Sequence, residues 1–172
     1  MLLDVVIAAC AAFAAAGVFM AAFRLTGRKA PRTLVMAVAA VAIVGVTAYL
    51  RYQWAANTEK LLPPQMVVIE RLTFSNLIEP WSAIHPVTDR LVVLDRGSIL
   101  RNPAHPDMVM VDVLLLDRMA DTIVGRHLVD CAGRRNAMVP ADADLSADQL
   151  PAGLQWGSDA PAALYDLACK PA

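Results

Sequence analysis

Residues 5–50 read VVIAACAAFAAAGVFMAAF, then RLTGRKAPR, then TLVMAVAAVAIVGVTAYL. The two outer runs, residues 5–23 and 33–50, contain no charged residue and are 19 and 18 residues long. At about 1.5 Å of rise per residue, a helix of this length crosses a hydrocarbon core roughly 30 Å thick. Gly27 and Pro31 interrupt helical structure between the runs. The segment predicts a transmembrane helical hairpin, with helices over about residues 4–24 and 32–52.

The turn between the two helices carries the signal for orientation. Short loops rich in Lys and Arg stay on the cytoplasmic side of a membrane. We therefore expect the turn in the cytoplasm and both chain termini on the outer side. The turn contains no acidic residue and four basic ones, namely Arg24, Arg28, Lys29 and Arg32.

Aromatic residues follow the second apolar run. Tyr and Trp favour the membrane–water interface, so we expect them to anchor the outer end of the second helix. Twelve arginines against three lysines, with abundant alanine, are typical of a GC-rich bacterial genome. The sequence thus predicts a bacterial inner-membrane protein whose C-terminal domain lies in the periplasm. The predicted anchors are Tyr49, Tyr52 and Trp54.

A cleaved signal peptide is the alternative to the first membrane helix. Signal peptides begin with a basic segment, whereas residues 1–4 hold Asp4 and no Lys or Arg. Residues 7–10, Ile-Ala-Ala-Cys, resemble a lipoprotein cleavage box, but few apolar residues precede Cys10 and the apolar run continues past it. We therefore expect an uncleaved anchor.

Small residues are frequent in both predicted helices. They let helix backbones approach closely in lipid, so we expect contacts within the hairpin or with another membrane protein. The alternative is that alanine is simply abundant in this chain. Neither run holds the charged or histidine side chains that transporters and proton relays use, which disfavours transport by this chain alone. The candidate packing residues are Ala12, Ala16, Gly17, Ala42 and Gly45.

Composition excludes two further classes. Hydrophobic residues make up 58% of the 172 residues, the mean hydropathy is +0.50, and charged residues are 18%. Intrinsic disorder needs the opposite balance. The net charge of −1 provides no basic excess for a phosphate backbone, so we expect no nucleic-acid partner. The expected partners are the lipid bilayer and a larger integral membrane protein complex.

The rest of the chain reads as a small β-rich domain. Residues 53–65, which contain Pro63 and Pro64, are expected to form a stiff linker, and residues 66–172 an extracytoplasmic domain. A helix near the C-terminus is expected to have Ser158 as its cap and Pro161 in its first turn. The predicted fold class is thus an α+β membrane protein. Strands are expected over residues 66–74, 90–95, 108–116, 124–131 and 135–139.

Two of the three cysteines, Cys131 and Cys169, fall in this domain. In an oxidising compartment such a pair is expected to form a disulfide. The alternative is two unrelated buried thiols. Cys10 lies inside the first membrane helix and is expected to be a small apolar residue there.

Residues 98–170 resemble the surface-adhesin E type domain of bacterial envelope proteins. The matching residues are Val129-Asp130-Cys131, Trp156, and the run Leu-Tyr-Asp-Leu-Ala-Cys over residues 164–169. The resemblance implies a small β-rich domain in which Cys131 pairs with Cys169. It implies no catalytic residues.

No motif for catalysis or cofactor binding stands out. His85, His105 and His127 are far apart and lack the close spacing of zinc ligands, so surface or turn positions are expected. The sequence contains no clustered glycines for a phosphate loop and no G-x-S-x-G elbow. Asp142, Asp144 and Ser146 imitate the start of a calcium loop, but the loop lacks its glycine and its final glutamate.

The sequence therefore predicts a protein that is not an enzyme and has no cofactor or metal. We expect a non-catalytic inner-membrane accessory subunit, or an assembly or stabilising factor, with a periplasmic docking domain. The alternative is a membrane-tethered periplasmic module that binds a ligand or acts as an adhesin.

Overall fold

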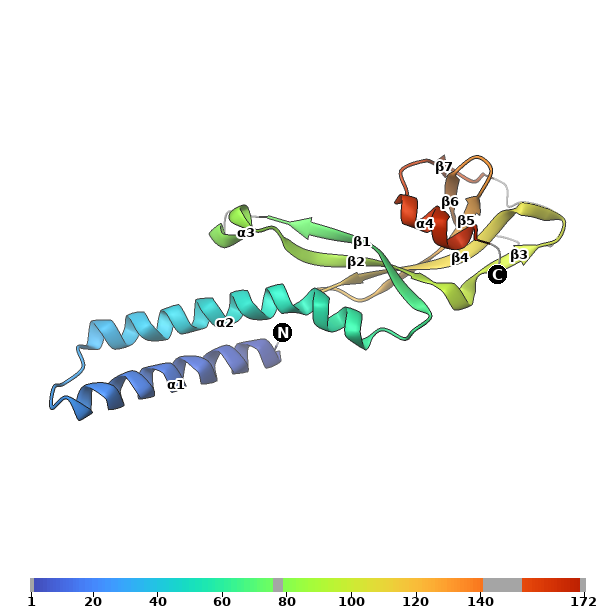
Figure 1. Cartoon of the computed structure of the whole chain (residues 1–172). Coiled ribbons are helices and arrows are strands. Elements are labelled where there is room, and N and C mark those ends of the chain that lie inside the picture. Colours follow the sequence, from blue (N-terminus) through green and yellow to red (C-terminus); the bar gives the residue numbers. More distant parts are fainter. Residues whose placement is uncertain (1, 76–78, 141–152, 171–172) are drawn as a thin grey trace. The chain divides into compact units, whose positions relative to one another are not determined.

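A computed structural model describes residues 2–75, 79–140 and 153–170 of the chain (Figure 1). Two N-terminal helices precede a domain built on an antiparallel sheet, so the predicted α+β class is confirmed. The chain divides into two compact units, Met1–Ala56 and Asn57–Ala172.

The first unit is a helical hairpin. Helix α1 covers Leu2–Leu25, and helix α2 begins at Arg32 and ends at Leu61. Gly27 follows α1 with φ of 71°, the left-handed conformation that glycine adopts without steric penalty at the end of a helix. The Arg28 amide donates a hydrogen bond to the Phe23 carbonyl, which satisfies one of the last carbonyls of α1. The turn expected around residues 24–32 is therefore present.

Both helices are long enough and apolar enough to cross a membrane, over Leu3–Leu25 and Arg32–Leu61. Large apolar side chains on them are exposed, as at Phe13, Val18 and Val41. The helices therefore lack the burial expected of the core helices of a globular domain.

Helix α2 is longer than expected. Residues 53–61 of the predicted linker 53–65 are helical, and the helix ends only at Leu61. These nine residues include no glycine or proline, and Pro63 and Pro64 come just after them. Because proline disfavours a helical conformation in the residue before it, the helix stops there and not at residue 52.

The second unit contains one antiparallel sheet with strand order β1-β2-β4-β5-β6-β7. Strand β3 pairs with β4 as well. Two short α-helices, α3 (Pro80–Ile84) and α4 (Ala162–Ala168), and a 3-10 turn at Arg96–Ser98 complete the unit. The strands are β1 (Met66–Phe74), β2 (Val87–Asp95), β3 (Leu100–Asn102), β4 (His105–Asp117), β5 (Ile123–Asp130), β6 (Arg135–Val139) and β7 (Trp156–Gly157).

All five expected strands are present. Strands β1 and β6 have the expected bounds, whereas β2 and β4 each begin three residues earlier. The added residues lie opposite residues of neighbouring strands in the sheet register, for example Val87 opposite Phe74 of β1 and His105 opposite Asn102 of β3. Such pairing cannot be read from the apolar pattern of one strand.

The main core lies between one sheet face and α4. Leu94, Val111 and Val129 from the sheet pack with Leu164 and Tyr165 from α4. The expected C-terminal helix is therefore confirmed and covers the sheet.

The expected start of that helix was wrong. Helix α4 begins at Ala162, and Pro161 occupies its N-cap position with ψ of 140°. Because Ala160 precedes a proline, it disfavours helical structure, so the helix cannot reach back to Ser158.

Candidate functional site

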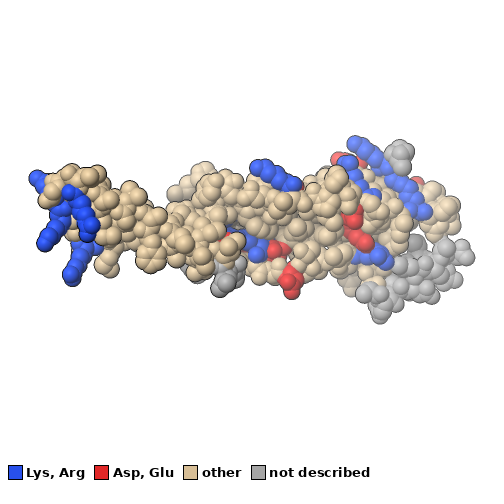
Figure 2. Space-filling view, turned by 90° about the horizontal axis from the view of Figure 1, so that it is seen from below, with Lys and Arg blue, Asp and Glu red and all other residues tan. Residues whose placement is uncertain are grey.

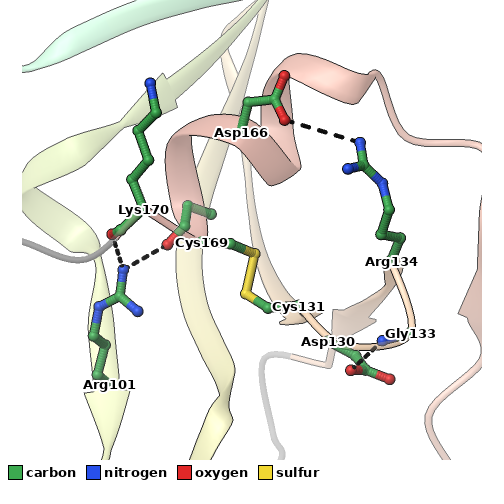
Figure 3. The surroundings of a disulfide bond; sticks show 9 residues. Arg101, Asp130, Cys131, Gly133, Arg134, Asp166, Cys169 and Lys170 are labelled. Carbon is green, nitrogen blue, oxygen red and sulfur yellow. Dashed lines mark hydrogen bonds and ion pairs between the residues drawn. A yellow bond between two sulfur atoms is a disulfide. The ribbon is translucent and has the colours of Figure 1, made fainter.

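The disulfide joins the end of β5 to the end of α4 (Figure 3). Cys131 and Cys169 are 38 residues apart in sequence, and their Cα atoms are 5.7 Å apart, a normal disulfide spacing. The predicted pairing is thus confirmed, and the alternative of two unrelated thiols is wrong. Cys10, in α1, is a free cysteine and is exposed.

Asp130, one residue before the disulfide, organises the turn between β5 and β6. Its Oδ1 accepts a hydrogen bond of 2.9 Å from the Gly133 amide, and its Oδ2 accepts one of 2.7 Å from Arg135. The Gly133 amide and the Arg135 guanidinium together lower the pKa of this buried carboxyl group. A Cβ atom on Gly133 would lie 2.5 Å from the Asp130 Oδ2, so a larger residue there would displace the carboxylate that organises the turn.

Two neighbouring arginines of this turn, Arg134 and Arg135, lie over aromatic rings. Arg134 lies over the Tyr165 ring at 5.1 Å and is 4.0 Å from the Asp166 carboxylate of α4. Arg135 lies over the Trp156 ring of β7 at 5.3 Å. Cation–π contacts of this kind connect the turn to both α4 and β7.

Arg101 of β3 holds the C-terminal end of α4. Its guanidinium donates hydrogen bonds to the carbonyl oxygens of Ala168, at 2.8 Å, and Lys170 (Figure 3). The last carbonyls of a helix have no partner within the helix, and Arg101 satisfies that of Ala168, the final residue of α4. An isolated helix as short as α4 is unstable in water, so these tertiary contacts stabilise it.

The titratable groups of this region are engaged in structural contacts. Among the residues that the structure describes, no three His, Cys, Asp or Glu side chains come together as metal ligands. His85 follows α3, His105 begins β4, and His127 lies within β5. The loop residues Asp142, Asp144 and Ser146 lie outside the described part of the chain.

His127 is half-buried, and burial lowers its pKa. Its Nδ1 lies 3.4 Å from the Asn136 amide nitrogen on β6. His127 thus lies half-buried on β5, next to the Asn136 amide.

The predicted helix-packing residues fall into two groups. Ala12 is buried, and Ala16 and Ala42 are half-buried. Gly17 and Gly45 are exposed, and apart from the flanking residues and the backbone of the same helix, no described atom lies within 4 Å of a Cβ atom built on either. Close packing at these two glycines, within the hairpin or against another membrane protein, stays a prediction. Each glycine faces the surface of the first unit.

The residues predicted to set the orientation lie in or next to the two helices, and the orientation itself stays a prediction. Lys and Arg side chains gather at the turn end of the two helices, and the adjoining surface carries no charged side chain (Figure 2). Arg24 lies in the last turn of α1, and Arg32 begins α2. Tyr49, Tyr52 and Trp54 all belong to α2, with Tyr49 and Tyr52 exposed and Trp54 half-buried.

The groups that form the β5–β6 turn and hold the end of α4 were not among the predicted site residues. Asp130 and Gly133 form an Asp-x-x-Gly pattern, which is typical of a tight turn and was detectable. No local sequence pattern predicts the role of Arg101, because its hydrogen-bond acceptor Ala168 is 67 residues away in the chain.

Comparisons of the chain with protein-family models, with curated proteins and with solved structures find no match. The resemblance of residues 98–170 to surface-adhesin E type domains stays a prediction.

Proposed function

We propose that this chain is a non-catalytic accessory subunit, or an assembly factor, of a larger membrane protein complex. The supporting observation is the hairpin of α1 and α2, whose large apolar side chains are exposed along both helices. Apolar surface of this extent is stable only when lipid or another membrane protein covers it. The two helices would anchor the chain and present a surface to partner helices.

The second unit supports a docking role on the outer side of a bacterial inner membrane. A disulfide persists in oxidising compartments such as the periplasm, and Cys131–Cys169 fastens α4 to the sheet. The basic turn from Arg24 to Arg32 favours a cytoplasmic position for the turn, which would place both termini outside. The charged groups around the disulfide stabilise the unit and are arranged as structural pairs.

A membrane-tethered binding module is the second candidate. It is favoured by the compactness of Asn57–Ala172, which has a sheet and a core of its own. In that case the outer domain would bind a soluble ligand or surface, as the resemblance to adhesin-type domains implies, and the helices would serve only as an anchor.

Purification in mild detergent separates the two proposals. The full chain, tagged after Ala172, would be extracted at several detergent strengths and its companions identified by mass spectrometry. The subunit proposal predicts a stoichiometric integral membrane partner that is lost only in harsh detergent. Recovery of the bare chain under every condition would contradict that proposal and favour the tethered module.

A further inference from the structure

The turn between α1 and α2 has four basic side chains whose charges the hairpin does not balance. All four are exposed, and they gather at the turn end of the two helices (Figure 2). Residues 5–58 contain no Asp or Glu. Among the residues that the structure describes, none of the four side chains forms an ion pair. We call them the basic cluster. Its members are Arg24, Arg28, Lys29 and Arg32.

Arginines of the second unit are arranged differently. Five of them form ion pairs with Asp or Glu side chains, at distances from 2.7 to 4.0 Å. Their charges are therefore balanced within the chain. A group of charges of one sign attracts ions of the opposite sign, so the basic cluster favours an anionic partner from outside the chain. The pairs of the second unit are Arg71–Glu59, Arg90–Asp117, Arg126–Asp112, Arg134–Asp166 and Arg135–Asp130.

Hydrogen bonds hold the turn in a defined conformation. The Gly27 amide donates a bond of 3.0 Å to the Arg24 carbonyl. The Phe23 carbonyl accepts a bond of 3.2 Å from the Arg28 amide and one of 2.8 Å from the Thr26 hydroxyl. The end of α1 thus continues into an ordered turn. A partner that binds there loses less conformational entropy than one that must first order a flexible loop.

Apolar side chains adjoin the basic cluster. Leu25 follows Arg24 and is 91% exposed, and Leu34 lies two residues after Arg32 and is 47% exposed. A soluble anion would leave both leucines in water. A phospholipid provides a phosphate group for the basic side chains and apolar chains for the leucines, in the way that Lys and Arg near helix ends reach toward the membrane surface. The surface around the turn therefore fits a phospholipid better than a soluble anion.

We propose that the basic cluster binds the phosphate headgroups of anionic phospholipids. This inference rests on the proposed function in one respect, namely that the hairpin of α1 and α2 crosses the bilayer, which places its turn at the membrane surface. Clusters of Lys and Arg beside a membrane helix attract anionic lipids by their charge. The bound headgroups supply the counter-charges that the hairpin lacks, and they hold the turn at the membrane surface.

Spin-labelled lipids measure this binding on the full chain. The protein would be reconstituted into vesicles of phosphatidylcholine that contain a trace of phosphatidylglycerol or phosphatidylcholine with a nitroxide on its acyl chain. Electron paramagnetic resonance separates lipids held at the protein surface from lipids of the bulk bilayer. We expect the association constant of phosphatidylglycerol to be several-fold higher than that of phosphatidylcholine. This preference should decrease as salt is added, because salt screens exposed charges.

Two double variants with the same change in net charge test whether the basic cluster is responsible. Arg28→Gln/Lys29→Gln removes two of its members and should strongly reduce the preference for phosphatidylglycerol. Arg96→Gln/Lys170→Gln removes two exposed basic residues of the second unit and should leave the preference unchanged. All four substituted side chains are exposed, so the helical content measured by circular dichroism should be the same in both variants.

The possible outcomes separate this inference from the proposed function. Equal association constants for the two lipids would contradict headgroup binding and leave the membrane hairpin intact. Equal losses of preference in the two double variants would overturn the role of the basic cluster. Loss of the preference when inorganic phosphate is added at constant ionic strength would make free phosphate the occupant and refute the lipid assignment. If no lipid is held at the protein surface, the hairpin does not enter the bilayer and both proposals fail.

Discussion

The Arg101 guanidinium donates a hydrogen bond of 2.8 Å to the carbonyl oxygen of Ala168, across 67 residues of sequence. This bond connects a three-residue edge strand to the end of a seven-residue helix. The same guanidinium also bonds the Lys170 carbonyl. The C-terminal helix is therefore attached to the sheet by a polar contact as well as by the disulfide.

Loss of this contact should destabilise the domain. We expect Arg101→Ala to lower the free energy of unfolding by about 1–2 kcal/mol, because the last carbonyl of α4 and the Lys170 carbonyl just after it lose a charged donor. Chemical unfolding of the full chain in detergent micelles would measure the change. Arg96→Ala is the matched control, since Arg96 is exposed and close in sequence, and it should change the unfolding free energy little. Equal effects of the two substitutions would contradict the proposed role of Arg101.

The disulfide should contribute more than the Arg101 contact. Its closed loop of about 38 residues predicts that Cys131→Ala lowers the unfolding free energy by roughly 2–5 kcal/mol. A reductant should have the same effect on the unmutated protein, whereas Cys10→Ser should have none. Mass spectrometry of the unreduced protein should find a Cys131–Cys169 linked peptide, and alkylation at both positions without reduction would refute the bond.

The Asp130 turn predicts a dependence of stability on acid pH. The Gly133 amide and Arg135 lower the pKa of Asp130 in the folded state below its unfolded value of about 3.9. The stabilisation is therefore complete above about pH 4 and is lost as the pH falls through the lower, folded-state pKa. Unfolding curves between neutral and strongly acidic pH would show this loss. It should be smaller in Asp130→Asn, and it should persist in Asp166→Asn, because Asp166 is exposed.

The basic turn makes the orientation of the hairpin testable. A reporter that is active only in the periplasm, fused after Ala172, should be active. Replacing the four basic residues of the turn by glutamine should reduce that activity, because the charge bias that retains the turn in the cytoplasm is then removed. Activity of a cytoplasm-only reporter at the same position would reverse the proposed topology.

The exposed glycines of the helices provide a test of partner binding. Among the described residues, a Cβ atom at Gly17 or Gly45 would meet nothing within 4 Å beyond its own helix turn, so leucine at either position should leave the hairpin folded. The added bulk should nevertheless weaken recovery of a partner whose helices pack there. Val18→Leu and Val41→Leu, at exposed positions of the same helices, are the controls. Unchanged recovery in both glycine variants would show that this surface faces lipid.

The hairpin, the α+β class and the approximate strands were predictable from the sequence. Each depends on the hydropathy of a continuous segment, as in residues 5–23, or on local breaks such as Gly27 and Pro31. The disulfide was expected from the predicted oxidising compartment and from the resemblance to surface-adhesin E type domains. The structure confirms it, because the Cys131 and Cys169 Cα atoms lie at disulfide distance.

Other features depended on contacts between distant residues. Three contacts join segments whose local sequences do not predict that they meet. They are the Arg101–Ala168 hydrogen bond, the Arg134–Tyr165 contact and the Glu59–Arg71 ion pair. Two helix boundaries also differ from the predicted ones. Helix α2 continues to Leu61, shortly before Pro63, and helix α4 begins only after Pro161. The sequence by itself determined which segments are apolar enough to enter a membrane or a core. Only the tertiary structure decided which apolar side chains of the sheet form the core with α4, since that depends on how strands far apart in the chain pair.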